Sequence, residues 1–187
     1  MLRCSACGSS ICGVPCAEKW WKRHRPECRR LQAVAFGEEY ARNEDRGYRL
    51  AYYALDGNTR LIKSLAAGLS DVVGKTKFKT AVRAAIRTFV DFIDPRNNLP
   101  AIYAAAQSNR LEVVRLLHEM RADLDKPNTV DGASPAYMAA QNDHTAMVRL
   151  LGHLPADLDR PAADGAAPIH VAAYQGHAAI AQLLYDL

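Results

Sequence analysis

The residues best suited to do chemistry lie together at the start of the chain. All five cysteines and one of the six histidines fall within the first 28 of 187 positions, as Cys4, Cys7, Cys12, Cys16, His24 and Cys28. A Cys-x-x-Cys turn points two thiolates at one ion, and a helix would carry His24 and Cys28 on one face. These donors predict a structural zinc site, with a disulfide or free thiols as the alternatives.

This stretch resembles the MYND-type zinc finger, a family whose module holds two zinc ions through interleaved ligands. The resemblance implies one complete site, formed by Cys4, Cys7, His24 and Cys28. Cys12 and Cys16 would belong to a second site whose first pair would precede Met1, so only half of that site is present. Both sites would be closed, and they would stabilise a small fold without offering an open catalytic position.

The match to this family is incomplete in several places. Trp21 falls where the family usually has tryptophan, whereas Ile11 replaces the usual aromatic residue and the gap between the two cysteine pairs is one residue short. Either the chain is truncated at its start, or it is a single-zinc variant in which Cys12 and Cys16 are merely buried. The ligand spacings that are kept after the start favour truncation.

Further along, the chain repeats itself three times with steps of 34 and 33 residues. Each copy carries an alanine pair and then a leucine pair: Ala105–Ala106, Ala139–Ala140 and Ala172–Ala173, followed by Leu116–Leu117, Leu150–Leu151 and Leu183–Leu184. Two short helical patterns and a turn signal at this period mark a stacked repeat. One unit is too small to bury its own apolar face, so its neighbours must cover it.

The copies resemble the ankyrin repeat, whose pattern is best matched by Pro168, Ile169, His170, Ala172, Ala173, Gly176 and His177. The resemblance implies a solenoid of helix pairs that binds proteins. Among the departures, only Ser134, directly before Pro135, can supply a helix-capping oxygen. Arg121 and Pro155 replace the glycine that usually ends the second helix, and proline cannot adopt a positive φ. The turn at Pro155 must therefore differ from the usual left-handed cap.

Residues 48–97 look like a fourth, degenerate ankyrin unit, which is longer than the others by 19 residues. The surplus is expected to form an inserted helix with one apolar face, made of Phe78, Val82, Ile86, Phe89 and Ile93. Asp94 and Pro95 should stop this helix. Its basic face is interpreted as solvated, with an acidic partner as the alternative; it comprises Lys75, Lys77, Lys79, Arg83 and Arg87.

Further polar residues recur at equivalent repeat positions, so we interpret them as loop or packing features rather than reactive groups. They are Asp123 with Asp125, Asp157 with Asp159, and the histidines His144 and His177. Tyr103 and Tyr137 lie on first helices, where they either pack internally or face a binding surface. The chain shows no nucleophile motif and no cofactor loop, so we expect neither catalytic nor cofactor-binding residues and no enzyme activity.

Composition sets the remaining expectations. Residues 1–30 carry seven Lys or Arg and two Asp or Glu, hence +5, while the 17 bases and 18 acids that follow give −1. No apolar run is long enough for a membrane span, no signal peptide is recognised, and the clustered cysteines suit a reducing compartment. We therefore expect an intracellular protein of the cytoplasm or nucleus, with no membrane partner and no small-molecule substrate.

The sequence thus predicts a mainly α protein that contains a small zinc-bound finger and an ankyrin-repeat helical solenoid with an inserted helix. The expected divisions are an incomplete MYND-type finger at 1–30, a helical connector at 31–47, the degenerate unit at 48–97 and the ankyrin repeats, the last one truncated, at 98–187. The expected function is a non-catalytic protein–protein interaction adaptor that binds zinc structurally and recognises other proteins or proline-containing peptides. The alternative is a nucleic-acid-associated regulator that uses the basic finger for salt-dependent phosphate contacts, although its ligand spacing is not that of a DNA-reading finger.

Overall fold

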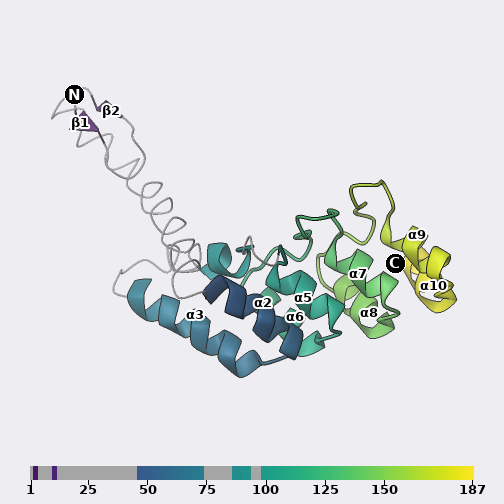
Figure 1. The fold of residues 1–187 in the computed structure, drawn as a ribbon, viewed down its shortest axis with the longest axis horizontal. Helices are drawn as coiled ribbons and strands as arrows, with labels where there is room; N and C mark the ends of the chain where they lie inside the picture. Colours follow the sequence, from purple (N-terminus) through teal and green to yellow (C-terminus); the bar gives the residue numbers. More distant parts are fainter. Residues whose placement is uncertain (1, 4–9, 12–45, 74–85, 94–97) are drawn as a thin grey trace.

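The computed structural model describes residues 2–3, 10–11, 46–73, 86–93 and 98–187, and its order of elements is shown in Figure 1. Two short antiparallel strands, β1 (Leu2–Arg3) and β2 (Ser10–Ile11), pair Leu2 with Ile11. The helices with defined bounds are α2 (Arg46–Asp56), α3 (Thr59–Val73), α5 (Ala101–Gln107), α6 (Leu111–Glu119), α7 (Pro135–Gln141), α8 (Thr145–His153), α9 (Pro168–Gln175) and α10 (Ala178–Asp186). None of these helices is both long and apolar enough to cross a membrane.

The helices of residues 46–187 form a row of stacked pairs (Figure 1). The first helices of successive pairs pack side by side, with α2 on α5, α5 on α7 and α7 on α9. The second helices pack in a parallel row, in which α3 contacts α6, α6 contacts α8 and α8 contacts α10. The long loops that lead into α7 and α9 rise on the side of the first helices, away from α6 and α8 (Figure 1).

Small apolar residues pack the row of first helices, and large apolar residues pack the row of second helices. Ala105, Ala106, Ala139 and Ala140 on the first helices are all 0% exposed, because their size lets the next helix approach closely. Leu117 and Leu151 on the second helices are also fully buried and fill the space between units. Each such leucine contributes about 1.5–3 kcal/mol of hydrophobic stabilisation. The alanine and leucine pairs of the first two copies thus have the packing roles that their spacing predicted, whereas Ala173 of the third copy is exposed.

The turn between the two helices of a pair has the same backbone geometry in every described unit. A residue with a positive φ follows each first helix: Gly57 (82°), Asn109 (53°), Asp143 (58°) and Gly176 (77°). Asparagine and aspartate tolerate this left-handed conformation better than other side chains do. At Gly57 a side chain would also crowd Arg110, because an added Cβ would lie 3.0 Å from its Cδ. The turn between α2 and α3 therefore matches those of the later pairs.

Helix ends follow the local signals in the sequence. Ser134 Oγ accepts the backbone N–H of Tyr137 at 3.1 Å and caps α7, with Pro135 in the first helical position, as predicted. At the end of α6, Arg121 adopts the left-handed conformation (φ 67°) that glycine usually takes. Before Pro155 the chain is extended instead, since Leu154 has φ −96° and ψ 162°. The prediction that this second turn differs is confirmed.

The segment expected to be an inserted helix is described only in part. Residues 86–90 are helical, and Phe89 and Val90 are almost fully buried. The helical residues end at 90, earlier than the expected stop at Asp94, and Asp91 contributes its carboxylate to the loop of the next unit. Phe78, Val82 and the lysines and arginine of the basic face other than Arg87 lie outside the described residues. The expected division of the chain into domains stays a prediction.

Candidate functional site

The predicted zinc ligands do not belong to the part of the chain that the structure describes. Cys4, Cys7, Cys12, Cys16, His24 and Cys28 all fall in the ranges 4–9 and 12–45, which lie outside it. Within the described ranges, no three His, Cys, Asp or Glu side chains are grouped so that they could hold a metal ion. The zinc site therefore stays a prediction from the sequence.

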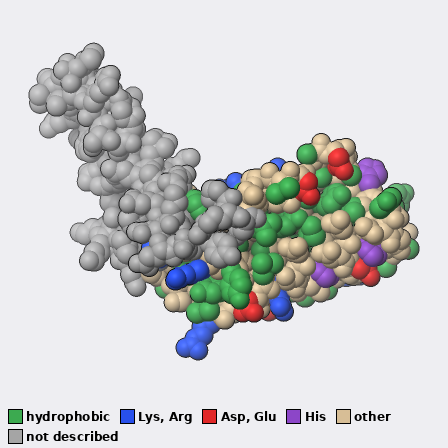
Figure 2. Space-filling view, viewed as in Figure 1, with side chains coloured by type: hydrophobic (Ala, Val, Ile, Leu, Met, Phe, Trp, Pro, Cys, Tyr) green, Lys and Arg blue, Asp and Glu red, His purple; other side chains and the backbone are tan. Residues whose placement is uncertain are grey.

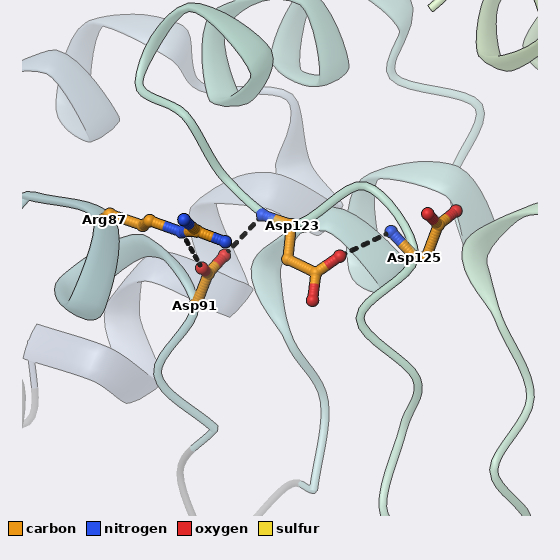
Figure 3. Close-up of polar contacts among 4 residues, drawn as sticks. All are labelled: Arg87, Asp91, Asp123 and Asp125. Carbon is orange, nitrogen blue, oxygen red and sulfur yellow. Dashed lines mark hydrogen bonds and ion pairs between the residues drawn. The ribbon is translucent and has the colours of Figure 1, made fainter. Parts of the chain in front are cut away.

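The aspartates of the loops connect successive units, because their carboxylates accept hydrogen bonds from backbone N–H groups of the next loop (Figure 3). Asp91 Oδ1 accepts the N–H of Asp123 at 2.7 Å, and Asp125 Oδ1 accepts the N–H of Asp157 at 2.8 Å. Within each loop, Asp123 Oδ1 accepts the N–H of Asp125 and Asp157 Oδ1 accepts that of Asp159, at 3.1 and 3.0 Å. We call these five residues the aspartate ladder. Their bonds support the interpretation of these aspartates as loop features.

Burial raises the pKa of two carboxylates of the ladder. It raises the pKa of Asp91 above its ordinary value of 3.8, and the hydrogen bond from Asp123 opposes this effect. The pKa of Asp125 is raised for the same reason and is lowered in part by the bond from Asp157. Each carboxylate is thus occupied by backbone donors, which is the chemistry of a structural link between units.

The repeated histidines also link one unit to the next. His144 Nε2 lies 3.0 Å from the carbonyl oxygen of Gln107, and His177 Nε2 lies 3.1 Å from that of Gln141. Because a carbonyl oxygen only accepts, these ring nitrogens carry the hydrogen. Arg110 makes the equivalent bond in the preceding unit, where its Nε donates to the carbonyl oxygen of Leu55 at 2.9 Å. Sequence reasoning missed Arg110, although it precedes His144 by one repeat step.

The loops that lead into α7 and α9 end in two tight turns, which we call the tips: residues 128–133 and 162–166. Gly132 and Gly165 have φ values of 71° and 85°, which glycine adopts without strain. The backbone N–H of Ala163 donates to the carbonyl oxygen of Asp131 at 2.9 Å, so the tips lie side by side. A side chain at Gly132 would put its Cβ 3.3 Å from the nitrogen of Ala163. The glycine therefore allows both the turn and the close approach.

Asn128 holds the first tip in shape and was not recognised from the sequence. Only 6% of this residue is exposed, and its Oδ1 accepts the N–H groups of Val130, Asp131 and Gly132 at 3.1–3.2 Å. The folded tip leaves Val130 77% exposed. A signal for this role was present, since asparagine readily bonds the backbone of the residues that follow it. An apolar side chain is thus presented to solvent by a rigid turn.

The structure separates the two tyrosines whose roles the sequence left open. Tyr103 on α5 is 3% exposed and packs internally. Tyr137, in the first turn of α7, is partly exposed beside the tips. Burial raises the pKa of Tyr137, and the carboxylates of Asp164 and Asp131 raise it further. Tyr137 therefore lies within electrostatic reach of both tips and is open to a ligand.

Comparison with protein families identifies the repeat. A family model described as ankyrin repeats (3 copies) matches residues 30–162 and 102–187. The chain belongs to the ankyrin-repeat family. A comparison with curated proteins gives no match. The matched region begins after the predicted zinc ligands, so the resemblance of residues 4–28 to a MYND-type finger gains no support from it.

Membership of the ankyrin-repeat family suggests a protein–protein interaction role for the exposed surface. Ankyrin repeats typically serve protein–protein interaction and are typically not catalytic, and the family comparison finds no catalytic family. The ankyrin surface of interest here consists of the two tips and the adjoining first turns of α7 and α9, and we call it the tip surface. Its exposed side chains include Val130, Asp131, Asp164 and His170, and Tyr137 is partly exposed. A rigid scaffold that presents loop residues is a common arrangement for binding.

Proposed function

We propose that this ankyrin-repeat protein is a non-catalytic adaptor that binds another protein through its tip surface. The observation that carries the proposal is that the first tip is held rigidly by Asn128 and by the second tip while Val130 remains exposed. A surface that is already ordered loses little conformational entropy when a partner binds, so more of the contact energy appears as affinity. Tyr137 adds an aromatic side chain of the kind that is enriched at binding hot spots.

The proposal includes a second binding module near the start of the chain, in which zinc acts structurally. The thiolate and imidazole donors of Cys4, Cys7, His24 and Cys28 suit zinc in number and type. Bound zinc would supply folding stability there. By the resemblance stated above, this module would recognise proline-containing peptides, and Cys12 and Cys16 would form half of a second site. Support for this part of the proposal comes from residue types and spacing alone.

The tip surface is tested by selection from a random peptide library displayed on phage, with the full-length chain as the target. Binding of the selected peptides is then compared between wild type and two substitutions, Val130→Ser and Arg149→Ala. Arg149 is an exposed residue of α8, in the other row of helices, and serves as the matched control. We expect a loss of about tenfold or more in affinity for Val130→Ser, since truncating a hot-spot side chain costs about 2 kcal/mol or more. We expect no change for Arg149→Ala.

Two outcomes would contradict the adaptor proposal in different ways. If no peptide is enriched, the surface does not bind polypeptide segments. If the selected peptides bind Val130→Ser as tightly as wild type, a different surface is responsible.

Elemental analysis of the purified chain tests the zinc module. One zinc ion per chain that is lost in Cys28→Ser supports the site formed by Cys4, Cys7, His24 and Cys28. Two ions would mean that ligands from outside the chain complete the site of Cys12 and Cys16. No zinc in protein purified without chelators would refute the module, and Val130→Ser should leave the zinc content unchanged.

A further inference from the structure

Charge is unevenly distributed between the two rows of helices. The first helices α5, α7 and α9 contain no Lys, Arg, Asp or Glu. The tips that adjoin them carry one formal charge each, Asp131 and Asp164, both negative and both exposed. Figure 2 shows acidic side chains beside hydrophobic ones in the part of the molecule where Figure 1 places these loops. The tip surface is therefore apolar with a negative charge.

The loops that lead to the tips contain the bases Lys126 and Arg160, which lie near the aspartate ladder. Lys126 lies close enough to Asp91 to lower its pKa against the larger, opposite effect of burial. Arg160 has the same relation to Asp125. Both cations thus lie within electrostatic reach of the aspartate ladder. Within the described part of the chain, no ion pair involves Asp131 or Asp164.

Each tip carboxylate keeps one oxygen available. Asp131 Oδ1 accepts the N–H of Ala133 at 3.1 Å, and Asp164 Oδ1 accepts that of Ala166 at 2.9 Å. These bonds fix the orientation of the carboxylates, while Oδ2 of each has no hydrogen-bond partner among the described residues. The partly exposed ring of Tyr137 lies within the electrostatic influence of both groups. Two oriented carboxylates and one aromatic face are thus available at one place.

We propose that the tip surface binds an extended segment of a partner protein that is rich in arginine or lysine, with one cationic side chain over Tyr137 and between Asp131 and Asp164. A cation over an aromatic face is attracted by the ring quadrupole, and arginine forms bidentate bonds with carboxylates. Val130 contacts the aliphatic part of a neighbouring side chain of the segment. The inference rests on the proposed function, because it names the chemistry of the partner for the same surface.

Synthetic peptides of defined charge test the inference directly. Three fluorescein-labelled peptides of equal length alternate glycine with arginine, with citrulline or with glutamate, and their binding to the full chain is measured by fluorescence anisotropy. Citrulline has nearly the shape of arginine without its charge. We expect the arginine peptide to bind at least about tenfold more tightly than the citrulline peptide and to weaken as salt is added, and the glutamate peptide not to bind.

Charge-removing substitutions then locate the site. Asp131→Asn with Asp164→Asn keeps the oxygens that cap the tips, so the fold is retained, which a thermal melt checks. Asp143→Asn is the matched control, because Asp143 is exposed, follows the other end of α7 and has a φ of 58° that asparagine accepts readily. We expect the affinity for the arginine peptide to fall about tenfold or more in the double substitution and about threefold in Tyr137→Leu. The control should leave this affinity unchanged.

The outcomes separate this inference from the proposed function. Equal binding of the arginine and citrulline peptides, or equal losses in the double substitution and in Asp143→Asn, would overturn the inference. In the library selection, peptides without enrichment of arginine and lysine would also overturn it while leaving the adaptor function in place. A failure to select any peptide, or selected peptides that bind Val130→Ser as tightly as wild type, would remove both.

Discussion

Removing the first carboxylate of the aspartate ladder should reveal how much one bond between units contributes. Asp91 Oδ1 accepts the N–H of Asp123 at 2.7 Å, and 16% of the Asp91 side chain is exposed. Asp91→Ala leaves this half-buried N–H without its acceptor, which costs about 1–3 kcal/mol of the free energy of unfolding. Asp91→Asn keeps an oxygen at the same place, so we expect a change of less than about 1 kcal/mol.

The pH dependence of the two substitutions follows from the pKa of Asp91. Burial raises this pKa above 3.8, so the folded protein binds the proton more tightly than the unfolded chain does. The resulting stabilisation is fully present below the unfolded-state pKa and is lost as the pH rises through the raised folded-state pKa. Asp91→Asn removes this titration. Its free energy of unfolding relative to wild type should therefore rise as the pH increases from about 4 through the raised pKa of Asp91.

Urea unfolding of wild type, Asp91→Ala and Asp91→Asn at several pH values measures both effects. Arg87→Ala is the control, since it removes the 3.6 Å ion pair with Asp91 but leaves the acceptor in place. The Arg87 side chain is 63% exposed, so its removal should cost less than about 0.5 kcal/mol. Equal destabilisation by alanine and asparagine would refute the reasoning, because the acceptor oxygen would then be irrelevant.

Three further predictions concern the ends of helices and the links between units, and thermal or urea unfolding checks each of them. Arg121→Gly should stabilise the protein by about 0.5–1 kcal/mol, because glycine adopts the left-handed conformation at the end of α6 without strain; destabilisation would contradict this. Ala167→Ser should raise the free energy of unfolding by about 1 kcal/mol, because serine gives α9 the capping oxygen that it lacks. Ser134→Ala should lower the free energy of unfolding by a similar amount. His144→Ala should cost about 0.5–1.5 kcal/mol, and His144→Arg should cost less, since Arg110 makes the same bond one unit earlier; equal losses would show that arginine cannot replace histidine there.

Much of the fold could be predicted because its signals are local in the sequence. The alanine and leucine pairs recur at the repeat period, and those of the first two copies occupy the buried faces that this period implies. The cap at Ser134 and the altered turn before Pro155 depend on one or two neighbouring residues, so they too were predicted. The repeated aspartates were correctly interpreted as loop features because a catalytic pair has no reason to recur in successive units.

Features that depend on contacts between units could not be predicted in the same way. Asp91 was assigned to an inserted helix, although it precedes Asp125 by 34 residues, one repeat step. Its bond to Asp123 requires two segments that are 32 residues apart to meet in space. Arg110 was overlooked because its residue type differs from that of His144, while its position and its bond are equivalent.

By itself, the sequence determined the repeat, its helix pairs and the residue types that stack them, because a period and an apolar pattern are properties of neighbouring positions. Only the tertiary structure decided which equivalent residues are covered. Ala140 is fully buried because α9 packs on α7, whereas Ala173, its counterpart on α9, is exposed where no described helix covers it. Likewise Tyr103 is buried and Tyr137 is open, although both occupy the same repeat position. Exposure depends on what packs against a residue, and one copy of a repeat cannot specify its neighbours.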